Sequence, residues 1–329
     1  MLGALRAWFG RHGFVEVDTP ALQVSPGLEP HLRAFETDLD EPFGMGRRRL
    51  YLHTSPEFAM KKLLAAGVPR LFQIGHVWRN EARSATHHPE FTMIEWYAAD
   101  ADWNDLAAQC EGLVRSGFDA VAPALSRGQL RWDGKTANPT LQFERLPVAE
   151  AFDRYAGIDL MATLDEKGAP NISALASACR GANIRCQEND TWDDMFFRVF
   201  VDRVEPNLGI GQPTLLESWP APLAALAQLD PRDARIAQRV ELYVAGLELG
   251  NGFGELTDAV EQRRRFEAER ETKALLGAAT YPIDEDFLAA LDHGLPSSAG
   301  MAIGFDRLVM VATGAEKIDD VLWLPVASS

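Results

Sequence analysis

Three carboxylates spaced seven residues apart are the first residues in this chain whose type and spacing suggest chemistry. Glu241, Glu248 and Glu255 lie in a segment with glycines at positions 246, 250, 252 and 254. A helix would place the three side chains on one exposed face. Because interior glycines cost a helix about 1 kcal/mol each, four of them argue against a helix this short. The segment is therefore predicted to be extended.

In an extended chain, an odd spacing places successive glutamates on opposite faces unless the chain bulges or turns between them, and the glycines permit either. A second interpretation makes Asn251 and Gly252 the turn of a hairpin, with Glu248 opposite Glu255. In either arrangement the clustered carboxylates repel one another unless a cation lies among them. A magnesium ion or the ammonium group of a ligand would supply that cation.

A second group of polar side chains surrounds a predicted antiparallel hairpin. Residues 70–78 and 91–97 alternate in hydropathy as strands do, and they flank the charged segment 79–90. Arg79 and Glu81 in this loop adjoin a face that carries Phe91, Glu95 and Tyr97. An arginine beside an aromatic ring suits a nucleotide, with the guanidinium on phosphate and the ring on the base. Glu95 either serves such a site among apolar neighbours or lies at a sheet edge in water.

The elements that must position these residues follow from hydrophobic periodicity and turn residues. Strands are predicted over 14–17 and 240–253. Helices are predicted over 2–11, from Ser55-Pro56-Glu57 onwards, behind Asp258 and over 306–312, and residues 300–305 lead into the last of these. The stretch 101–230 is helical with several interruptions and is interpreted as an insertion. Strands distant in sequence and few strand-helix-strand units predict an α+β fold with one antiparallel sheet.

Composition excludes several classes of protein. The chain has 329 residues, 47% of them hydrophobic, and a formal charge of -16, so broad nucleic-acid binding by counterion release is not expected. Three cysteines are too few for a disulfide framework. With no apolar run long enough for a signal peptide or a membrane span, a cytoplasmic protein without a membrane partner is expected. Neither a P-loop nor a Rossmann fingerprint occurs, so arginines and carboxylates must carry out any phosphate chemistry.

With these residues in place, the chain resembles a class II aminoacyl-tRNA synthetase of the lysyl type over most of its length. Gly13-Phe-Val-Glu-Val-Asp-Thr-Pro20 resembles motif 1, Phe72 to Glu81 with His88-Pro-Glu-Phe91 resembles motif 2, and Gly304-Phe-Asp-Arg307 resembles motif 3. The segments 247–258 and 293–296 resemble the lysine-specific branch. The resemblance implies an antiparallel sheet flanked by helices, the use of ATP and Mg²⁺, and a homodimer formed through motif 1 around Pro20.

The resemblance also assigns roles to single residues. It implies that Arg79 and Arg307 are catalytic. ATP would be bound by Arg79, Asn80, Glu81, His88, Phe91, Glu248, Leu249, Gly304 and Arg307. The second substrate would be bound by Ser55, Pro56, Glu57, Glu95, Tyr97, Asn251, Glu255 and Ala302. Glu241 and Glu248 would hold the magnesium ion, and His88 departs from the pattern, which has asparagine at that position.

Two features favour the short paralogues of the lysyl enzymes, which ligate (R)-β-lysine to elongation factor P. The motif 1 helix starts at residue 2, which leaves no room for an anticodon-binding domain, and Ala302 stands where the synthetase pattern has glycine. A single catalytic domain over 1–329 would then activate (R)-β-lysine as an adenylate and transfer it to a lysine ε-amine of elongation factor P. The alternative is a truncated synthetase-like enzyme that charges a tRNA or a small-molecule amine, and the net charge disfavours tRNA.

Overall fold

The computed structural model describes residues 1–29, 31–125 and 128–326 and divides into two compact units. One unit contains residues 1–4, 102–255 and 311–314, and we call it the central unit because most of it comes from the middle of the sequence. The other contains residues 5–101, 256–310 and the chain from 315 onwards, and we call it the flanking unit because its residues lie on both sides of that stretch in the sequence. Within the described ranges, every helix is too short or too polar to cross a lipid bilayer.

The flanking unit is built on four neighbouring strands, in the order β1 (Val15–Glu16), β5 (Arg70–Trp78), β6 (Glu90–Ala99) and β14 (Ser298–Gly304). β6 pairs antiparallel with β5 and with β14, while β1 adds a parallel edge to β5. The helix α1 (Leu2–Arg11) buries Phe9, which stacks on Phe72 of β5 with ring centres 4.2 Å apart. The predicted hairpin and its polar loop 79–90 are thus confirmed.

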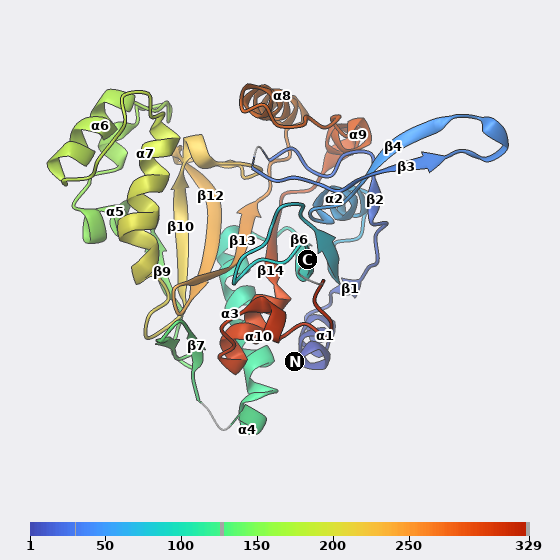
Figure 1. Cartoon of the computed structure of the whole chain (residues 1–329), viewed down its shortest axis with the longest axis horizontal. Helices are drawn as coiled ribbons and strands as arrows, with labels where there is room; N and C mark the ends of the chain where they lie inside the picture. The colour runs from blue at the N-terminus through green and yellow to red at the C-terminus, as the bar shows by residue number, and fades with distance from the viewer. Residues whose placement is uncertain (30, 126–127, 327–329) are drawn as a thin grey trace. The chain divides into compact units, whose positions relative to one another are not determined.

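Three helices of the flanking unit pack together through aromatic rings (Figure 1). They are α2 (Glu57–Ala65), α8 (Ala259–Leu275) and α9 (Glu285–Gly294). Phe58 of α2 stacks on Phe287 of α9 at 4.5 Å, and Phe266 of α8 lies 6.1 Å from Phe287. A fourth helix, α10 (Phe305–Thr313), begins directly after β14, as the sequence predicts for this segment.

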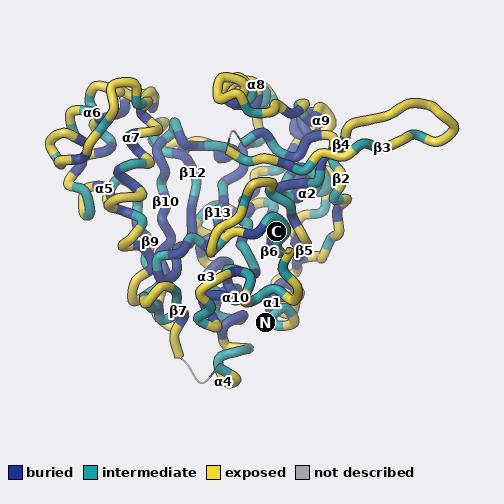
Figure 2. The backbone as a smooth tube through the Cα atoms, in the orientation of Figure 1, coloured by how far each residue is buried: buried dark blue, intermediate teal, exposed yellow. Residues whose placement is uncertain are grey.

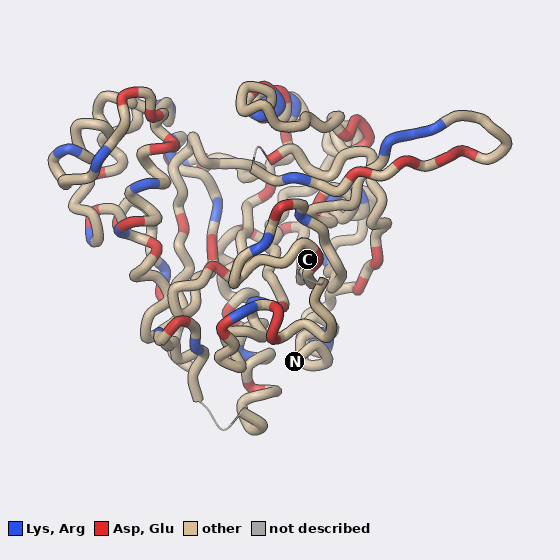
Figure 3. Tube along the Cα trace, in the orientation of Figure 1, with Lys and Arg blue, Asp and Glu red and all other residues tan. Residues whose placement is uncertain are grey.

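A separate small sheet in the flanking unit forms the protruding hairpin visible in Figure 1. It comprises β2 (Leu22–Gln23), β4 (Arg47–Leu52) and β3 (Glu36–Asp40), and a short 3-10 helix, Pro42–Gly44, lies at its tip. Figure 3 shows acidic residues along β3 and basic residues along β4. Cross-strand ion pairs join Arg47 to Asp40 at 2.9 Å and Arg49 to Asp38 at 2.6 Å.

The central unit contains its own run of neighbouring strands, β13 (Leu247–Gly254), β12 (Asp233–Val244), β10 (Thr214–Pro220) and β9 (Glu144–Pro147). β12 pairs antiparallel with β10 and β13, β9 pairs parallel with β10, and β11 (Leu229–Asp230) pairs with β12. Its helices are α3 (Trp103–Asp119), α4 (Ala122–Leu125), α5 (Val148–Ala156), α6 (Ile172–Gly181) and α7 (Trp192–Val199), the last continuing as a π-helix over Phe200–Val204.

The core of the central unit lies between α5, α7 and the strands β10 and β12, which appear dark blue in Figure 2. Phe152 and Trp192 both stack on Phe196 there, and Trp219 of β10 also contacts Phe196. The predicted helices of the stretch 101–230 are present, but this stretch also contributes the strands β7 (Leu130–Trp132), β8 (Lys135–Ala137), β9 and β10. The α+β prediction is confirmed, and the two parallel pairings, of β1 with β5 and of β9 with β10, make the strand pairing mixed.

Candidate active site

The carboxylate segment of the central unit is the hairpin of β12 and β13, and its turn lies at Ala245 and Gly246. Both residues have positive φ, 52° and 80°, as a two-residue hairpin turn with right-handed strand twist requires. The alternative turn at Asn251 and Gly252 is wrong, because both residues pair with β12 inside the continuous strand β13. Asn251 lies opposite Glu241.

A bulge in β13 sets the faces of the first two glutamates. Leu242 pairs with Gly250, whereas the next residue, Tyr243, pairs with Glu248, so that Leu249 is the extra residue. Glu248 therefore shares the face of Tyr243, and Tyr243 shares the face of Glu241 two positions along β12. The turn and the bulge together let Glu241 and Glu248 lie on one face although an odd spacing of seven residues separates them. Glu255 follows the end of β13 and is buried, with 1% of its surface exposed.

The Glu241 carboxylate is buried and is held by two donors from its own strand. Tyr243 Oη donates to one oxygen at 2.7 Å and Arg239 Nη2 donates to the other at 2.6 Å. Arg239 is itself fixed over the Trp219 ring, 4.2 Å from its centre. Burial raises the pKa of Glu241 to about 7; Arg239 opposes this rise, and the nearby charge of Glu248 adds to it.

The carboxylates of Glu241 and Glu248 together suit a magnesium ion that is bound along with a nucleotide. Mg²⁺ in nucleotide sites takes one or two carboxylates and completes its shell with phosphate oxygens and water. Among the residues that the structure describes, no group of three metal-ligating side chains is assembled, so an all-protein cage is not formed there. The repulsion between Glu241 and Glu248 is what a divalent cation would relieve.

In the flanking unit, Glu95 is buried in β6 and accepts two short hydrogen bonds. Tyr97 Oη donates at 2.5 Å and Ser55 Oγ at 2.8 Å. Burial and the charge of Glu57 raise the pKa of Glu95 to about 8, against a partial opposing effect of these bonds and of Lys61. With 1% of its surface exposed, Glu95 does not lie in water at a sheet edge, so that alternative is wrong. Ala302 of β14 pairs directly with it.

The start of α2 supports this arrangement. The helix begins at Glu57, and Pro56 rather than Ser55 occupies its N-cap position. Ser55 Oγ nevertheless accepts from the Glu57 N–H at 3.0 Å while donating to Glu95. Lys61, one turn further along the helix, is fully buried and donates to Glu57 at 2.5 Å. Two carboxylates and one ammonium are thus held close together at the end of this helix.

The motif 2 loop brings an arginine to an aromatic ring, as the sequence predicts. The Arg79 guanidinium lies 5.3 Å from the centre of the Phe91 ring. The Asn80 N–H donates to the Arg33 carbonyl, and Arg33 also forms an ion pair with the exposed Glu81 at 2.5 Å. Glu81 has a φ of 65°, which directs the chain back towards β6.

Arg307, in the first turn of α10 after Gly304, is held by the same loop. Its Nε donates to the Thr86 carbonyl at 3.0 Å, and its Nη2 donates to His87 Nε2 at 2.8 Å. Burial and the positive charges of Arg307 and Arg79 lower the pKa of His87 to about 4. His87 is therefore neutral near pH 7, which suits an acceptor for an arginine.

His88 is engaged differently. Its Nδ1 lies 2.6 Å from the Glu90 carbonyl, and its Nε2 lies 3.1 Å from the Val326 N–H. This network assigns the proton to Nδ1 and the lone pair to Nε2. Both ring nitrogens are thus occupied by backbone, and a contact between His88 and ATP would have to replace the one to Val326.

Sequence reasoning missed four residues that hold the predicted ones in place: Lys61, His87, Arg239 and Tyr243. Lys61 lies four residues after Glu57, a helical pairing that could have been recognised. Arg239 and Tyr243 flank Glu241 at two-residue spacing and so share its face on a strand. The contact of His87 with Arg307 spans 220 positions, and no local pattern signals it.

Comparisons with known proteins find similarity over nearly the whole chain. The family model of class II tRNA synthetases (D, K and N) matches residues 1–328. A protein of Proteus mirabilis named elongation factor P--(R)-beta-lysine ligase is 38% identical over 322 residues, which cover 98% of this chain and 91% of that protein. Proteins of the same name from Haemophilus influenzae and Pectobacterium atrosepticum are 38% and 37% identical, with the same coverage.

The buried Glu95 predicts a pH dependence of stability that Glu95→Gln removes. Because its pKa is raised in the folded chain, its contribution is full below the unfolded pKa of 4.5 and is lost as pH rises through about 8. Relative to Glu95→Gln, the wild-type free energy of unfolding should fall by up to about 1.4 kcal/mol per pH unit between these limits. Urea unfolding of the ligand-free proteins at pH 5, 6, 7 and 8 measures it. Parallel curves for the two proteins would contradict the buried, protonated Glu95.

Proposed function

We propose, because the chain belongs to the class II tRNA synthetase family of the D, K and N type, that it activates (R)-β-lysine with ATP and transfers it to a lysine ε-amine of elongation factor P. The name that its relatives share over 98% of this chain is the observation that carries the proposal. The acceptor would place the reaction in the cytoplasm, where translation factors work.

The chemistry of the sites supports a substrate with two ammonium groups and one carboxylate. We propose that Glu95, Tyr97 and Glu255 bind the side-chain ammonium, because Glu95 and Glu255 are buried carboxylates that a cation would stabilise. Asn251 would add a polar contact. Ser55, Pro56 and Glu57 would bind the other amino group, and Arg79 the carboxylate, since a guanidinium pairs well with a planar anion.

ATP would be bound by the motif 2 and motif 3 residues. Phe91 would stack on the adenine, with Glu81 at its amino group and Asn80, His88, Leu249 and Gly304 lining the nucleotide. Arg79 would contact the α-phosphate and Arg307 the far end of the triphosphate. A magnesium ion between Glu241 and Glu248 would neutralise phosphate charge.

The reaction then needs positioning and charge stabilisation rather than a protein nucleophile. The β-lysine carboxylate attacks the α-phosphorus, the bond to the β-phosphate breaks, and pyrophosphate leaves with the electron pair. Arg79 stabilises charge on the α-phosphate, and Arg307, held by His87 and the Thr86 carbonyl, stabilises charge on the leaving group. The acceptor amine, after losing a proton, attacks the adenylate carbonyl and releases AMP.

Isotope exchange between ATP and pyrophosphate tests the first half of the proposal. Exchange should depend on (R)-β-lysine, with α-lysine at least tenfold less effective, and Glu241→Gln should lower it at least tenfold. Labelled β-lysine should then appear on elongation factor P. No exchange with either lysine would contradict the activation step. Label on tRNA instead of the factor would favour the family's other acceptor and contradict the protein one.

Ala302 should determine the preference between the two isomers. Its methyl group lies on the face of Glu95, directly opposite in the β6–β14 pair, and occupies space in the proposed pocket. Ala302→Gly should lower the ratio of kcat/KM for β-lysine over α-lysine about tenfold or more, the range that one methyl group contributes in a pocket. Ala299→Gly is a matched control, because Ala299 is buried in the same strand and an odd spacing places it on the other face. Equal ratios for both variants would count against this role.

We also propose a homodimer formed through the motif 1 segment. Val15, Leu22 and Val24 around Pro20 are aliphatic and between 43% and 55% exposed, as a covered subunit surface requires. Light scattering should give twice the chain mass of 36.3 kDa. Val15→Asp should yield monomers, whereas Val260→Asp, at an 81% exposed position on α8, should not. A monomeric wild type would refute the dimer.

A further inference from the structure

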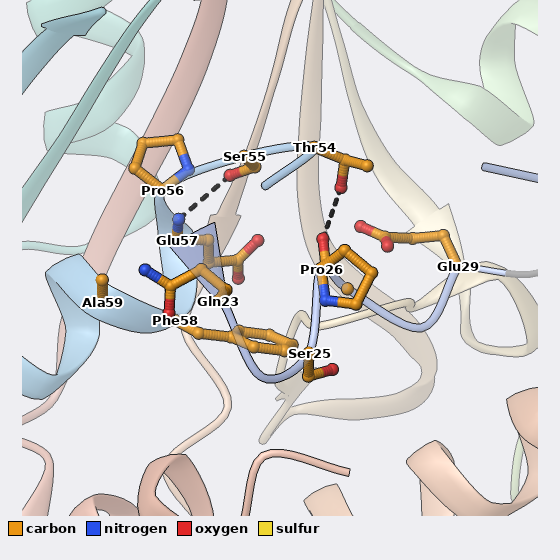
Figure 4. Close-up of a pocket in the computed structure, with 11 residues that line it drawn as sticks. Gln23, Ser25, Pro26, Glu29, Thr54, Ser55, Pro56, Glu57, Phe58 and Ala59 are labelled. Atoms are coloured by element: carbon orange, nitrogen blue, oxygen red, sulfur yellow. Dashed lines mark hydrogen bonds between the residues drawn. The ribbon is translucent and has the colours of Figure 1, made fainter. Parts of the chain in front are cut away.

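A pocket in the flanking unit lies beside the start of α2 and is separate from the Glu95 side chain. Figure 4 shows the residues around it, among them two acidic ones, Glu29 and Glu57. Glu57 extends from the helix and Glu29 from the loop after β2, and both side chains point towards the middle of the pocket (Figure 4). The loop that carries Glu29 thus adds a second carboxylate to the end of the site at which Glu57 lies.

Glu29 is an unusual pocket residue because one oxygen of its carboxylate has no hydrogen-bond partner among the described residues. Its Oε2 atom is shielded from solvent, and no described residue donates a hydrogen bond to it. Ser25, also in the lining, is 2% exposed and has a hydroxyl in the same condition. A buried polar group without a partner costs about 1–3 kcal/mol, more when it is charged, so these two atoms indicate a polar ligand.

The backbone at Gly27 leaves room for the Glu29 carboxylate. Gly27 lines the pocket with a φ of +115°, and a Cβ at this position would lie 2.6 Å from Glu29 Oε2 and 3.2 Å from Thr54 Oγ1. The hydroxyl of Thr54 is used elsewhere, since it donates to the Pro26 carbonyl at 2.6 Å (Figure 4). Because Gly27 has no side chain, the backbone can pass close to the Glu29 carboxylate. The Thr54 hydroxyl does not compensate that carboxylate, since it donates to the Pro26 carbonyl.

A third carboxylate, Glu269 of α8, interacts electrostatically with both acids. Burial raises the pKa of Glu29, with the charge of Glu57 adding to the rise. Burial also raises the pKa of Glu269 to about 8, and the charges of Glu29 and Glu57 contribute. Glu269 is therefore mostly protonated near pH 7 when no ligand is bound.

Three cations near this cluster donate hydrogen bonds to identified groups. Lys273 donates to the carbonyls of Glu29 and Leu32 at 3.0 and 2.7 Å and lies over the Tyr281 ring. Lys61 donates to Glu57, and Arg265 to Glu261 at 2.8 Å. Arg79 and Lys273 lower the pKa of Glu29 only in part, and Arg265 and Lys273 do the same for Glu269.

We propose that Glu29 is a substrate-binding residue which, with Glu57, holds the amino group nearest the substrate carboxylate, and that Glu269 is a positioning residue behind it. This inference rests on the proposed function. In a β-amino acid this ammonium is attached one carbon further from the carboxylate, a bond of about 1.5 Å, than in an α-amino acid. A pocket wall that extends from Glu57 to a second carboxylate suits the displaced group.

Binding then exchanges a proton for the ligand's charge. The substrate enters as an ammonium, the acid cluster ionises to pair with it, and the displaced proton goes to the buffer, so charge and protons balance. An α-amino acid, whose ammonium lies nearer to Glu57, would gain less from Glu29. Glu29 would therefore favour β-lysine over α-lysine through its contact with the amino group, independently of the methyl group of Ala302.

The test measures binding of (R)-β-lysine and α-lysine to the full chain by calorimetry at pH 7, in two buffers that differ in ionisation enthalpy. Glu29→Gln should weaken β-lysine binding about 10–100-fold, as expected for a lost hydrogen bond to a charged group, and α-lysine binding less than about threefold. Proton release on β-lysine binding should fall with it. Glu269→Gln should weaken β-lysine binding less, about three- to tenfold, and also reduce proton release.

The matched control is Glu271→Gln, an exposed glutamate on the same helix as Glu269. If Glu29→Gln and Glu269→Gln both behave like this control while the wild type binds and activates β-lysine, the inference fails and the proposed function stands. Equal weakening of both lysines by Glu29→Gln also overturns it. A wild type that binds neither isomer overturns both. Should Glu29→Gln not fold, Glu29→Asp, which keeps the charge, and Glu269→Gln decide the question.

Discussion

The free-energy cost of burying a carboxylate is the constraint on which the candidate sites depend. Glu241 in the central unit and Glu95 in the flanking unit are both buried, and burial raises their pKa values to about 7 and 8. In each site a tyrosine two residues along the same strand donates to the acid, Tyr243 to Glu241 and Tyr97 to Glu95. Such hydroxyls hold the carboxyl group in place in either protonation state, so a cation can bind without rearranging the strand. Each site is therefore preorganised for positive charge.

Irregularities of the backbone place Glu248 on the same face of the β12–β13 hairpin as Glu241. The positive φ of Ala245 and Gly246 closes the β12–β13 hairpin, and the extra Leu249 then turns Glu248 to the face of Glu241. Leu249 itself is 2% exposed, so the bulge also buries an apolar side chain. A one-residue change of register would move each acid to the opposite face. The bulge therefore belongs to the chemistry of the site as well as to its fold.

The sequence predicts the elements better than their contacts. The hairpin of β5 and β6, the helices α1, α2 and α8, and the β14–α10 junction follow from local periodicity and turn residues, and the structure confirms them. The turn at Ala245 was missed because alanine rarely adopts a positive φ, and Asn251-Gly252 is the stronger local signal. Arg307 meets His87 only through folding, and the contact of Val326 with His88 spans 238 positions, so no local pattern could reveal either. Resemblance to the family's motifs therefore predicts the roles of single residues, whereas only the folded structure reveals the residues that hold them in place.

An acidic chain whose arginines are proposed to bind phosphate must keep them from being neutralised by its own carboxylates. The exposed arginines of β4 pair with acids of β3 across the strands, contacts that contribute little to stability but satisfy surface charge locally. Arg307 is treated differently, because a backbone carbonyl and a neutral imidazole are among its acceptors. The pKa of His87 falls to about 4 because it is buried between Arg307 and Arg79, so its own acceptor state is maintained by the arginine it orients. Neutral acceptors such as these orient a guanidinium without cancelling its positive charge.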